Sequence, residues 1–231
     1  MIYDWDVFWT YLFDPRMARA ALVTVGVATL AQTLATLIGF FVALGLMARP
    51  PLSIAAHAYI WIFRGVPPLV LLLMLYFGLP QLGLRLPVFQ AGVIGLSLYA
   101  SGYMAEIIRS GLQSIDRGQA EAARSLGFSR AETMRSILLP QAFRIILPPF
   151  GNEFSSMMRT TSLLSVISFE ELLRVTTLAI NQVFRPIELY SVAALYYLAL
   201  TTGWMLIQHQ LESRAARGRR RAGTRLTTPA H

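Results

Sequence analysis

Residues 20–47 form the feature that most constrains how this chain can fold, because this long stretch contains no charged residue. A helix needs about 20 predominantly apolar residues to cross the hydrocarbon core of a membrane, which is about 30 Å thick. Small side chains recur at every fourth position of the stretch, and such a stripe lets two helices approach closely in lipid. The stripe consists of Ala31, Ala35, Gly39 and Ala43. The sequence therefore predicts an all-α integral membrane protein.

The composition of the chain supports the same fold class. Of its 231 residues, 55% are hydrophobic and only 14% are charged, and the mean hydropathy is +0.53. These values are too apolar for an ordinary soluble domain. Further apolar stretches extend the prediction to a single transmembrane domain, a bundle of five transmembrane helices. The five spans are expected at about residues 20–47, 53–80, 88–108, 141–167 and 189–210.

The second and fourth of these spans are interrupted. Arg64-Gly65 and Pro67-Pro68 fall inside the second span, which predicts a bent helix whose freed backbone groups face protein or a water-lined cavity. The fourth span is the least apolar, and Pro148-Pro149 is expected to break it. Charged side chains within a span usually face the bundle interior or an aqueous cavity. Those of the fourth span are Arg144, Glu153 and Arg159.

Shorter features flank the spans. Aromatic residues at helical spacing near the start, among them Trp5 and Trp9, predict a short helix in the membrane interface, with a disordered tail as the alternative. Glu106 and Arg109 stand three residues apart at the end of the third span, which predicts a local ion pair on one helix face. Residues 169–188 are polar and predict a short helix and an outside loop.

A polar stretch at residues 116–140 predicts two short helices with a tight corner between them. Asp116 can cap the first helix, and Gln119, three residues later, can close a capping-box-like pair with it. Gly127 stands at the corner, where a left-handed residue ends the helix and glycine adopts that conformation without a Cβ clash.

The second helix of this hairpin has its own signals. Ser129 and Glu132 have the spacing of a capping box. Pro140 cannot continue the helix in the usual hydrogen-bonding pattern. A helical hairpin of this kind between membrane spans is shaped to lie at the water boundary and press against another surface.

One run within the hairpin matches a known signature. Glu121-Ala122-Ala123 is followed at fixed spacing by Gly127, Ile137 and Leu139-Pro140. The run resembles, at every fixed position, the EAA signature of permease subunits of bacterial ABC importers. The resemblance implies that the hairpin lies on the cytoplasmic face and docks on an ATP-binding subunit, with an ordinary polar loop as the alternative. The implied docking residues are Glu121, Ala122, Ala123, Leu126, Gly127, Ile137, Leu139 and Pro140.

Other segments resemble the polar amino acid branch of the same family. They are residues 64–67, 76–80, 103–109, 149–154 and 161–163. The chain departs from the branch at Arg159-Thr160, where the family usually has Lys-Asp, so the positive charge is kept and the acid is lost. The resemblance covers about residues 20–212 and implies a permease that carries an amino acid.

The resemblance also implies partners and no chemistry in this chain. A second permease subunit, identical or homologous, would complete the pathway, ATPase subunits would bind ATP and Mg, and an extracytoplasmic binding protein would deliver the amino acid. The composition agrees, because all 20 basic residues are arginines and a P-loop needs a lysine. There is no cysteine and the three histidines are scattered, so we expect no metal site and no catalytic residue. The arginines flank apolar spans, which favours membrane topology over a nucleic-acid partner.

The distribution of arginines sets the expected orientation. Residues 109–144 and the tail at residues 212–231 carry six arginines each. The positive-inside rule places both regions in the cytoplasm, and five spans then leave the acidic N-terminus outside the bacterial inner membrane. We expect the basic cytoplasmic tail to be disordered at an anionic membrane surface, and we expect no cleaved signal peptide.

The fourth span is the candidate wall of the pathway. A free amino acid carries an ammonium and a carboxylate, and a low-dielectric pathway must offer partners to both. Glu153 and Arg159 have the two signs required, although ion pairs that hold helices together would explain them equally well. The full candidate set is Asn152, Glu153, Arg159, Thr161 and Ser162. The alternative function is a gradient-driven secondary transporter or channel, which leaves the hairpin unexplained.

Overall fold

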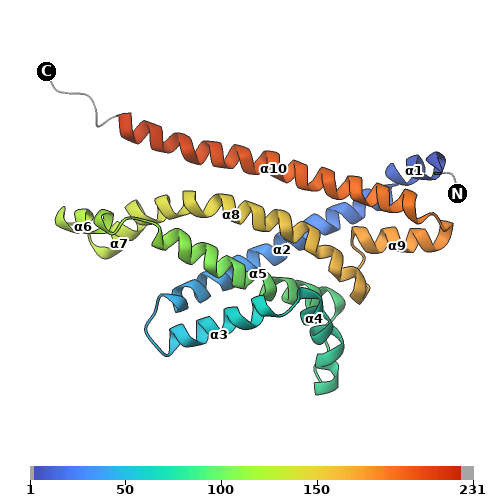
Figure 1. The fold of residues 1–231 in the computed structure, drawn as a ribbon, viewed down its shortest axis with the longest axis horizontal. Coiled ribbons are helices and arrows are strands. Elements are labelled where there is room, and N and C mark those ends of the chain that lie inside the picture. The colour runs from blue at the N-terminus through green and yellow to red at the C-terminus, as the bar shows by residue number, and fades with distance from the viewer. Residues whose placement is uncertain (1–2, 225–231) are drawn as a thin grey trace.

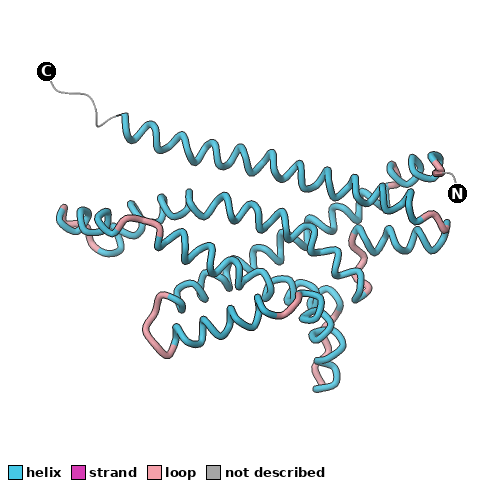
Figure 2. Tube along the Cα trace, in the orientation of Figure 1, coloured by secondary structure: helices cyan, strands magenta, loops and turns pink. Residues whose placement is uncertain are grey.

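The computed structural model describes residues 3–224, and it describes side chains as far as residue 215. All regular secondary structure within residues 3–224 is helical, and short loops join the helices (Figure 1, Figure 2). The helices are α1 (Trp5–Leu12), α2 (Pro15–Leu46), α3 (Leu52–Gly65), α4 (Pro68–Leu73), α5 (Val88–Gln113), α6 (Arg117–Ser125), α7 (Arg130–Thr133), α8 (Leu139–Thr160), α9 (Leu172–Val183) and α10 (Pro186–Thr224). Tighter or wider helical turns cover Met74–Gly78, Leu79–Leu82, Met134–Leu138 and Thr161–Ile167. The predicted all-α fold class is confirmed.

Three helices are long and apolar enough to cross a membrane, namely α2, α5 and the Pro186–Ala215 part of α10. Helix α3 and the segment Pro68–Leu82 could form a fourth span together, but they are bent by 98° at the break between them. This bend confirms the interruption expected in the second span. Helix α8 is not among the long apolar helices, in keeping with its charged residues, and the total of five spans stays a prediction.

The centre of the molecule is the contact between α2 and α5, which lie against each other (Figure 1). The three alanines of the small-residue stripe on α2 are completely buried, and Gly39 is buried as well. A Cβ atom added to Gly39 would come within 2.7 Å of the Met104 Cβ and 2.9 Å of the Ala105 backbone nitrogen. Only a glycine therefore permits this approach of the two helices, as the stripe of small residues predicted.

Helix α8 corrects one expectation from the sequence. Pro148 and Pro149 lie inside it, and the helix is not broken there. Each proline removes one amide donor, but the rest of the helical ladder continues on both sides. The expected short polar helix after this span is present as α9, and helix α1 is present near the start of the chain.

Helix α10 corrects a second expectation. It continues without interruption to Thr224, so residues 212–224 are helical rather than disordered. The rest of the predicted tail, residues 225–231, lies outside the described part of the chain. The N-terminal end of α10 packs against α1, where the Tyr196 hydroxyl donates a hydrogen bond to the Leu12 carbonyl over 2.8 Å.

Candidate functional site

The first helix of the hairpin, α6, begins at a capped residue. The Asp116 carboxylate accepts a hydrogen bond from the Gly118 amide at 2.6 Å, which confirms the predicted cap. The capping-box-like pair with Gln119 is wrong, because no hydrogen bond of the Gln119 side chain to Asp116 is present within residues 3–224. Asp116 satisfies the second amide of the helix, whereas a capping box requires the third.

The corner of the hairpin is built as predicted. Gly127 has φ of +86°, in the left-handed region. Its amide donates to the Arg124 carbonyl at 3.0 Å, and the Phe128 amide donates to the Ala123 carbonyl at 3.1 Å. This pair of bonds is a Schellman motif, which closes a helix through a left-handed residue.

The second helix of the hairpin, α7, begins with the predicted capping box. The Ser129 amide donates to the Glu132 carboxylate at 2.9 Å, and the Glu132 amide donates to the Ser129 hydroxyl at 3.2 Å. Hydrogen bonding to Ser129, through the side chain first and the backbone second, lowers the pKa of Glu132. Both helices of the hairpin therefore begin at a capped residue, and the end of α6 is closed at the corner.

The hairpin runs into α8 without a loop. After α7 the chain makes a wide helical turn over Met134–Leu138, and α8 begins at Leu139. The usual α pattern gives way just before Pro140, as expected for a residue that lacks an amide donor. Residues 130–167 therefore form one continuous helical segment that includes α7 and α8.

The hairpin exposes several apolar side chains. Leu126 is 77% exposed and Leu139 is 44% exposed. Phe128 and Met134 are exposed as well, although the signature does not include them. Ala123 faces inward and is buried, and Ile137 is half-buried. The remaining predicted docking residues lie at the surface, namely Glu121, Ala122, Gly127 and Pro140.

The predicted pathway residues lie along the second half of α8 and the turn that follows. Asn152 is exposed and Glu153 is half-buried. Arg159 donates a hydrogen bond to the Ser155 hydroxyl at 3.1 Å, and it forms no ion pair with Glu153. An ion pair between these two residues within one chain is therefore absent from the part of the chain whose side chains are described.

The last two predicted pathway residues, Thr161 and Ser162, donate their hydroxyl hydrogen bonds to backbone carbonyls. The Thr161 hydroxyl donates to the Met158 carbonyl at 2.8 Å, and the Ser162 hydroxyl donates to the Arg159 carbonyl at 2.7 Å. Thr161 is completely buried and Ser162 is half-buried. Both hydroxyls close the tight turn at the end of α8, so the structure does not gather all five predicted residues around one cavity.

Glu106 has a partner other than the predicted one. It forms an ion pair with Arg64 of α3, while Arg109 donates to the Gln113 side chain at 3.0 Å. The predicted pair of Glu106 with Arg109 is therefore wrong. The Arg64 guanidinium also lies 4.7 Å from the centre of the Tyr103 ring, a distance typical of cation–π contacts. Because α3 packs against α5, Glu106 pairs with Arg64, which is distant in the sequence, and not with Arg109 on its own helix.

The sequence analysis did not predict the ion pair between Arg64 and Glu106, although one feature of the sequence pointed to it. Arg64 is a charged residue inside an apolar span, and such residues usually have a partner in the bundle. Gly102 makes the contact possible, because a Cβ atom there would come within 2.9 Å of the Arg64 side chain. The ion pair holds the end of α3 on α5, directly before the bend at Val66 and Pro67.

Two side chains of α10 attach it to α8, and no sequence pattern indicated them. The Trp204 indole donates to the Gly151 carbonyl at 2.7 Å, and the Gln208 amide donates to the Pro148 carbonyl at 3.2 Å. Trp204 and Gln208 are four residues apart and so share one face of α10. The two helices are thereby joined at Pro148 and Gly151, which precede Glu153 in the chain.

A cavity of about 770 Å³ lies where the hairpin meets these helices. Its lining comes from the end of α5, the start of α6, the start of α8 and the later part of α10. The polar residues among its lining are Ser114, Asp116, Gln119, Gln141, Arg144 and Glu212. No group of three or more metal-ligating side chains occurs among the described residues.

The chain matches the family model described as "binding-protein-dependent transport system inner membrane component" over residues 35–217. It is 39% identical to the arginine transport system permease protein ArgU of Corynebacterium glutamicum, over 96% of this chain and 75% of the relative. It is 34% identical to the glutamine transport system permease protein GlnP of Escherichia coli K12, over 93% of this chain and 98% of the relative.

Solved structures give a similar result. A chain from a crystal structure of an amino acid ABC transporter with histidines matches with a TM-score of 0.85 and 39% identity, over 93% of this chain and 100% of that chain. A chain of the MetNI methionine ABC transporter in an inward-facing conformation matches with a TM-score of 0.73 at 17% identity, over 86% of this chain and 95% of that chain, and this likeness concerns the fold alone.

Proposed function

Because the chain belongs to the family of binding-protein-dependent transport system inner membrane components, we propose that its hairpin, residues 116–140, is the docking element for a separate ATP-binding subunit. The chain is a multi-pass inner membrane permease subunit of an ABC importer for amino acids. The alternative of a gradient-driven transporter is set aside, because the relatives are permeases of ABC systems. The chain acts as a transport subunit, and the proposed ATPase partner binds ATP and Mg.

The observation that carries this proposal is the exposure of apolar side chains on a hairpin that is otherwise complete. Both helices of the hairpin are capped and the corner is closed by its own backbone, so the hairpin does not need Leu126 for its own structure. Leu126 is 77% exposed beside the polar residues of the hairpin. A partner that covers this side chain removes its apolar surface from water, which stabilises the complex. Gly127 follows Leu126 in the chain, and the other docking residues proposed from the sequence signature lie on α6 and on the helical segment after the corner.

Movement of the docked hairpin would reach the pathway through the helical backbone. Residues 130–167 are one helical segment, so displacement of α7 by the ATPase subunit also displaces α8 and Glu153. Trp204 and Gln208 join α10 to the same segment. ATP can shift the importer between its two access states only if it binds them with different affinity, and this hairpin is the element that transmits the difference.

The pathway itself is proposed to run along α8. Glu153 is half-buried and Arg159 is exposed, and neither is neutralised by an ion pair within the described chain. The Glu153 carboxylate can therefore accept hydrogen bonds from the ammonium group of an amino acid, and the Arg159 guanidinium can donate hydrogen bonds to its carboxylate. Asn152 is exposed on the same helix, whereas Thr161 and Ser162 shape the turn below it.

The remaining partners follow from the same assembly. A second permease subunit, either a copy of this chain or a homologue, completes the pathway, and an extracytoplasmic binding protein delivers the amino acid. The start of α2 and the hairpin lie at opposite ends of the bundle (Figure 1). This supports an orientation with the N-terminus outside and the basic end of α10 in the cytoplasm. The arginine and glutamine systems named among the relatives support a polar amino acid as the substrate class.

Co-purification tests the docking proposal. Leu126→Glu places a charge on the exposed side chain and keeps the backbone amide through which Leu126 caps the end of α6. The detergent-solubilised wild-type chain is expected to retain its ATPase subunit, and Leu126→Glu is expected to lose most of it. Leu84→Glu is the matched control, because Leu84 is also exposed, at 62%, but lies in the loop between α4 and α5. Equal retention by both variants would contradict the proposal.

A second experiment separates substrate contact from structure in α8. Glu153→Gln and Arg159→Gln are expected to abolish transport while the ATPase activity is still stimulated by the loaded binding protein. Failure of the variants to assemble with the ATPase subunit would instead assign these residues to ion pairs between subunits. Mass spectrometry of the same preparation identifies the second permease chain.

A further inference from the structure

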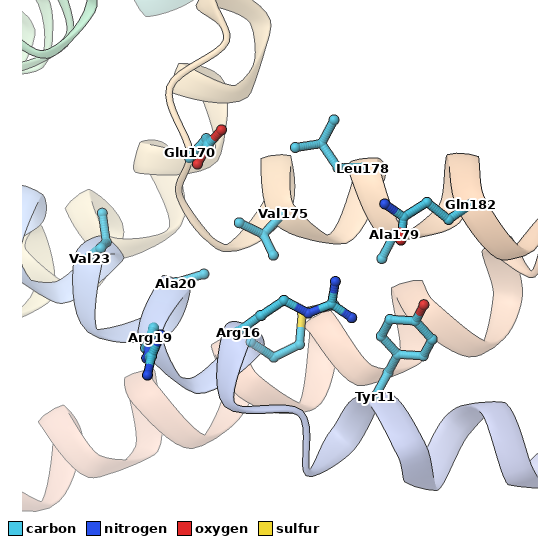
Figure 3. Close-up of a pocket in the computed structure, with 11 residues that line it drawn as sticks. Tyr11, Arg16, Arg19, Ala20, Val23, Glu170, Val175, Leu178, Ala179 and Gln182 are labelled. Atoms are coloured by element: carbon cyan, nitrogen blue, oxygen red, sulfur yellow. The ribbon is translucent and has the colours of Figure 1, made fainter.

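A cavity of about 360 Å³ lies near α1 and α9, at the end of the molecule away from the hairpin (Figure 1), and Figure 3 shows the residues that line it. It lies between the first turns of α2 and helix α9, and Tyr11 of α1 closes one side. Its apolar lining consists of Met17, Ala20, Val23, Val175, Leu178 and Ala179. Its polar lining consists of Tyr11, Arg16, Arg19, Glu170 and Gln182. The cavity thus joins an apolar wall to groups of both charges.

The positions of the two arginines need an explanation. Arg16 lies in the first turn of α2, where the helix dipole favours negative charge, and Arg19 lies one turn further on. Asp14 compensates Arg16, since its carboxylate accepts hydrogen bonds from that guanidinium at 2.7 to 3.2 Å. Arg19 has no such partner among the side chains that the structure describes. A positive group therefore lies on the cavity without an ion pair to any side chain that the structure describes.

The depth of the cavity in a membrane follows from the length of α2. Its 32 residues extend over about 48 Å at 1.5 Å per residue, well beyond a hydrocarbon core of about 30 Å. The first turns of α2 therefore reach the headgroup layer. Helix α1 directly precedes α2 and exposes Trp5 and Trp9. Tryptophan side chains prefer the headgroup layer, which supports the same depth. The apolar wall at Val23 lies one to two turns deeper along α2 than Arg16 and Arg19.

We propose that this cavity binds one phospholipid molecule whose headgroup carries both a phosphate and a primary ammonium group, as phosphatidylethanolamine does. Arg19, with Arg16 beside it, receives the phosphate, and the Glu170 carboxylate receives the ammonium. An acyl chain lies along Val23, Val175 and Leu178. Figure 3 shows Arg16 extending from α2 toward α9, with Glu170 at one end of the group and Gln182 at the other.

The presence of Glu170 decides which headgroup fits. A headgroup with a net negative charge would bring its phosphate to the arginines but would leave Glu170 without a positive partner. The ammonium of phosphatidylethanolamine supplies that partner and can also donate hydrogen bonds to the carboxylate. The lipid would join α2 to α9, two helices that are distant in sequence.

The test uses native mass spectrometry of the whole importer complex after purification from membranes that contain phosphatidylethanolamine and phosphatidylglycerol. The wild type is expected to retain one phosphatidylethanolamine for each copy of this chain. Arg19→Gln removes a charge-assisted hydrogen bond and is expected to lower that retention about tenfold. Arg49→Gln, in the loop between α2 and α3, is the matched arginine control and is expected to retain the lipid.

Two further variants test the other parts of the site. Val23→Trp fills the apolar wall at a side chain that is 39% exposed, and it is expected to expel the lipid without altering any charge. Glu170→Gln is expected to remove the preference for phosphatidylethanolamine over phosphatidylglycerol. Retention unchanged by Arg19→Gln and Val23→Trp would overturn the proposal, and so would wild-type enrichment of phosphatidylglycerol. Unchanged co-purification of the ATPase subunit shows that each variant is folded.

Discussion

The second helix of the hairpin and helix α8 are parts of one continuous helical segment, yet the hairpin and α8 are stabilised by different kinds of contact. In the hairpin, each cap joins residues that are two to five positions apart. In α8, the stabilising hydrogen bonds come from Trp204 and Gln208, which are 53 and 60 residues away from their acceptors. The hairpin thus leaves its outer side chains exposed, whereas α8 is attached to the bundle by side chains of another helix.

The difference also concerns what a substitution should damage. A change inside the bundle disturbs side chains from two or more helices and lowers the stability of the whole fold. A change in the hairpin alters a local structure at the edge of the molecule and should affect docking before it affects stability. Four experiments test this contrast, in order of decreasing expected effect.

Gly39→Leu is expected to have the largest effect. The added side chain has no room between α2 and α5, because a Cβ atom alone would lie 2.7 Å from the Met104 Cβ. Overpacking of this kind should lower the free energy of unfolding by about 3 kcal/mol. Thermal unfolding in detergent measures the loss. Gly26→Leu is the matched control on the same helix, since a Cβ atom at Gly26 meets no atom within 4 Å.

Gly151→Ala tests the join between α8 and α10. A Cβ atom at Gly151 would overlap the Gln208 side chain, which must then give up its hydrogen bond to Pro148. We expect a loss of about 1 to 2 kcal/mol in unfolding free energy, together with slower transport. Gly203→Ala on α10 has open space around its Cβ and should leave both unchanged. Co-purification with the ATPase subunit should be normal for Gly151→Ala. Its loss would show that docking depends on the contacts between α8 and α10 and not on the hairpin alone.

Gly127→Ala tests the hairpin corner. Alanine in a left-handed conformation costs about 1 kcal/mol, so the corner should open more often. We expect weaker retention of the ATPase subunit with an almost unchanged unfolding temperature. Gly65→Ala, a glycine at the end of α3 with open space around its Cβ, serves as the comparison. A large drop in unfolding temperature for Gly127→Ala would show that the hairpin is not independent of the bundle.

The smallest expected effect is the pH dependence of the second hairpin helix. Because the pKa of Glu132 is lowered in the folded hairpin, its capping contribution is fully present above the ordinary glutamate pKa. It is lost as the pH falls through the lowered value. Hydrogen exchange of residues 126–138, corrected for intrinsic rates, should show protection that declines in this acidic window. Glu132→Gln should have weaker protection that does not change with pH in the same window.

The sequence predicted the parts of the site that depend on local contacts. Gly127, Ser129 and Glu132 act through hydrogen bonds to residues within one turn, and each has the role that its type and spacing indicated. The stripe of small residues on α2 was predictable for a related reason, because only close helix packing explains an alanine or glycine at every fourth position.

The same reasoning failed where a distant residue competed with a near one. Glu106 was predicted to pair with Arg109 on its own helix, but α3 brings Arg64 to it. Pro148-Pro149 was predicted to break a span, but the rest of the hydrogen-bond ladder keeps α8 continuous. The spacing of residues along one helix identifies neighbours on that helix. It does not indicate which other helix packs against it.

The sequence by itself thus determined the all-α membrane fold class, the family and the capped hairpin, because long apolar runs and short-range hydrogen bonds are written in consecutive residues. Only the tertiary structure decided the partners of Arg64, Trp204 and Gln208, and only it brought α2 and α9 together around a cavity with Arg19 and Glu170. These features depend on side chains far apart in the chain, whose proximity follows from helix packing and from no pattern in the sequence.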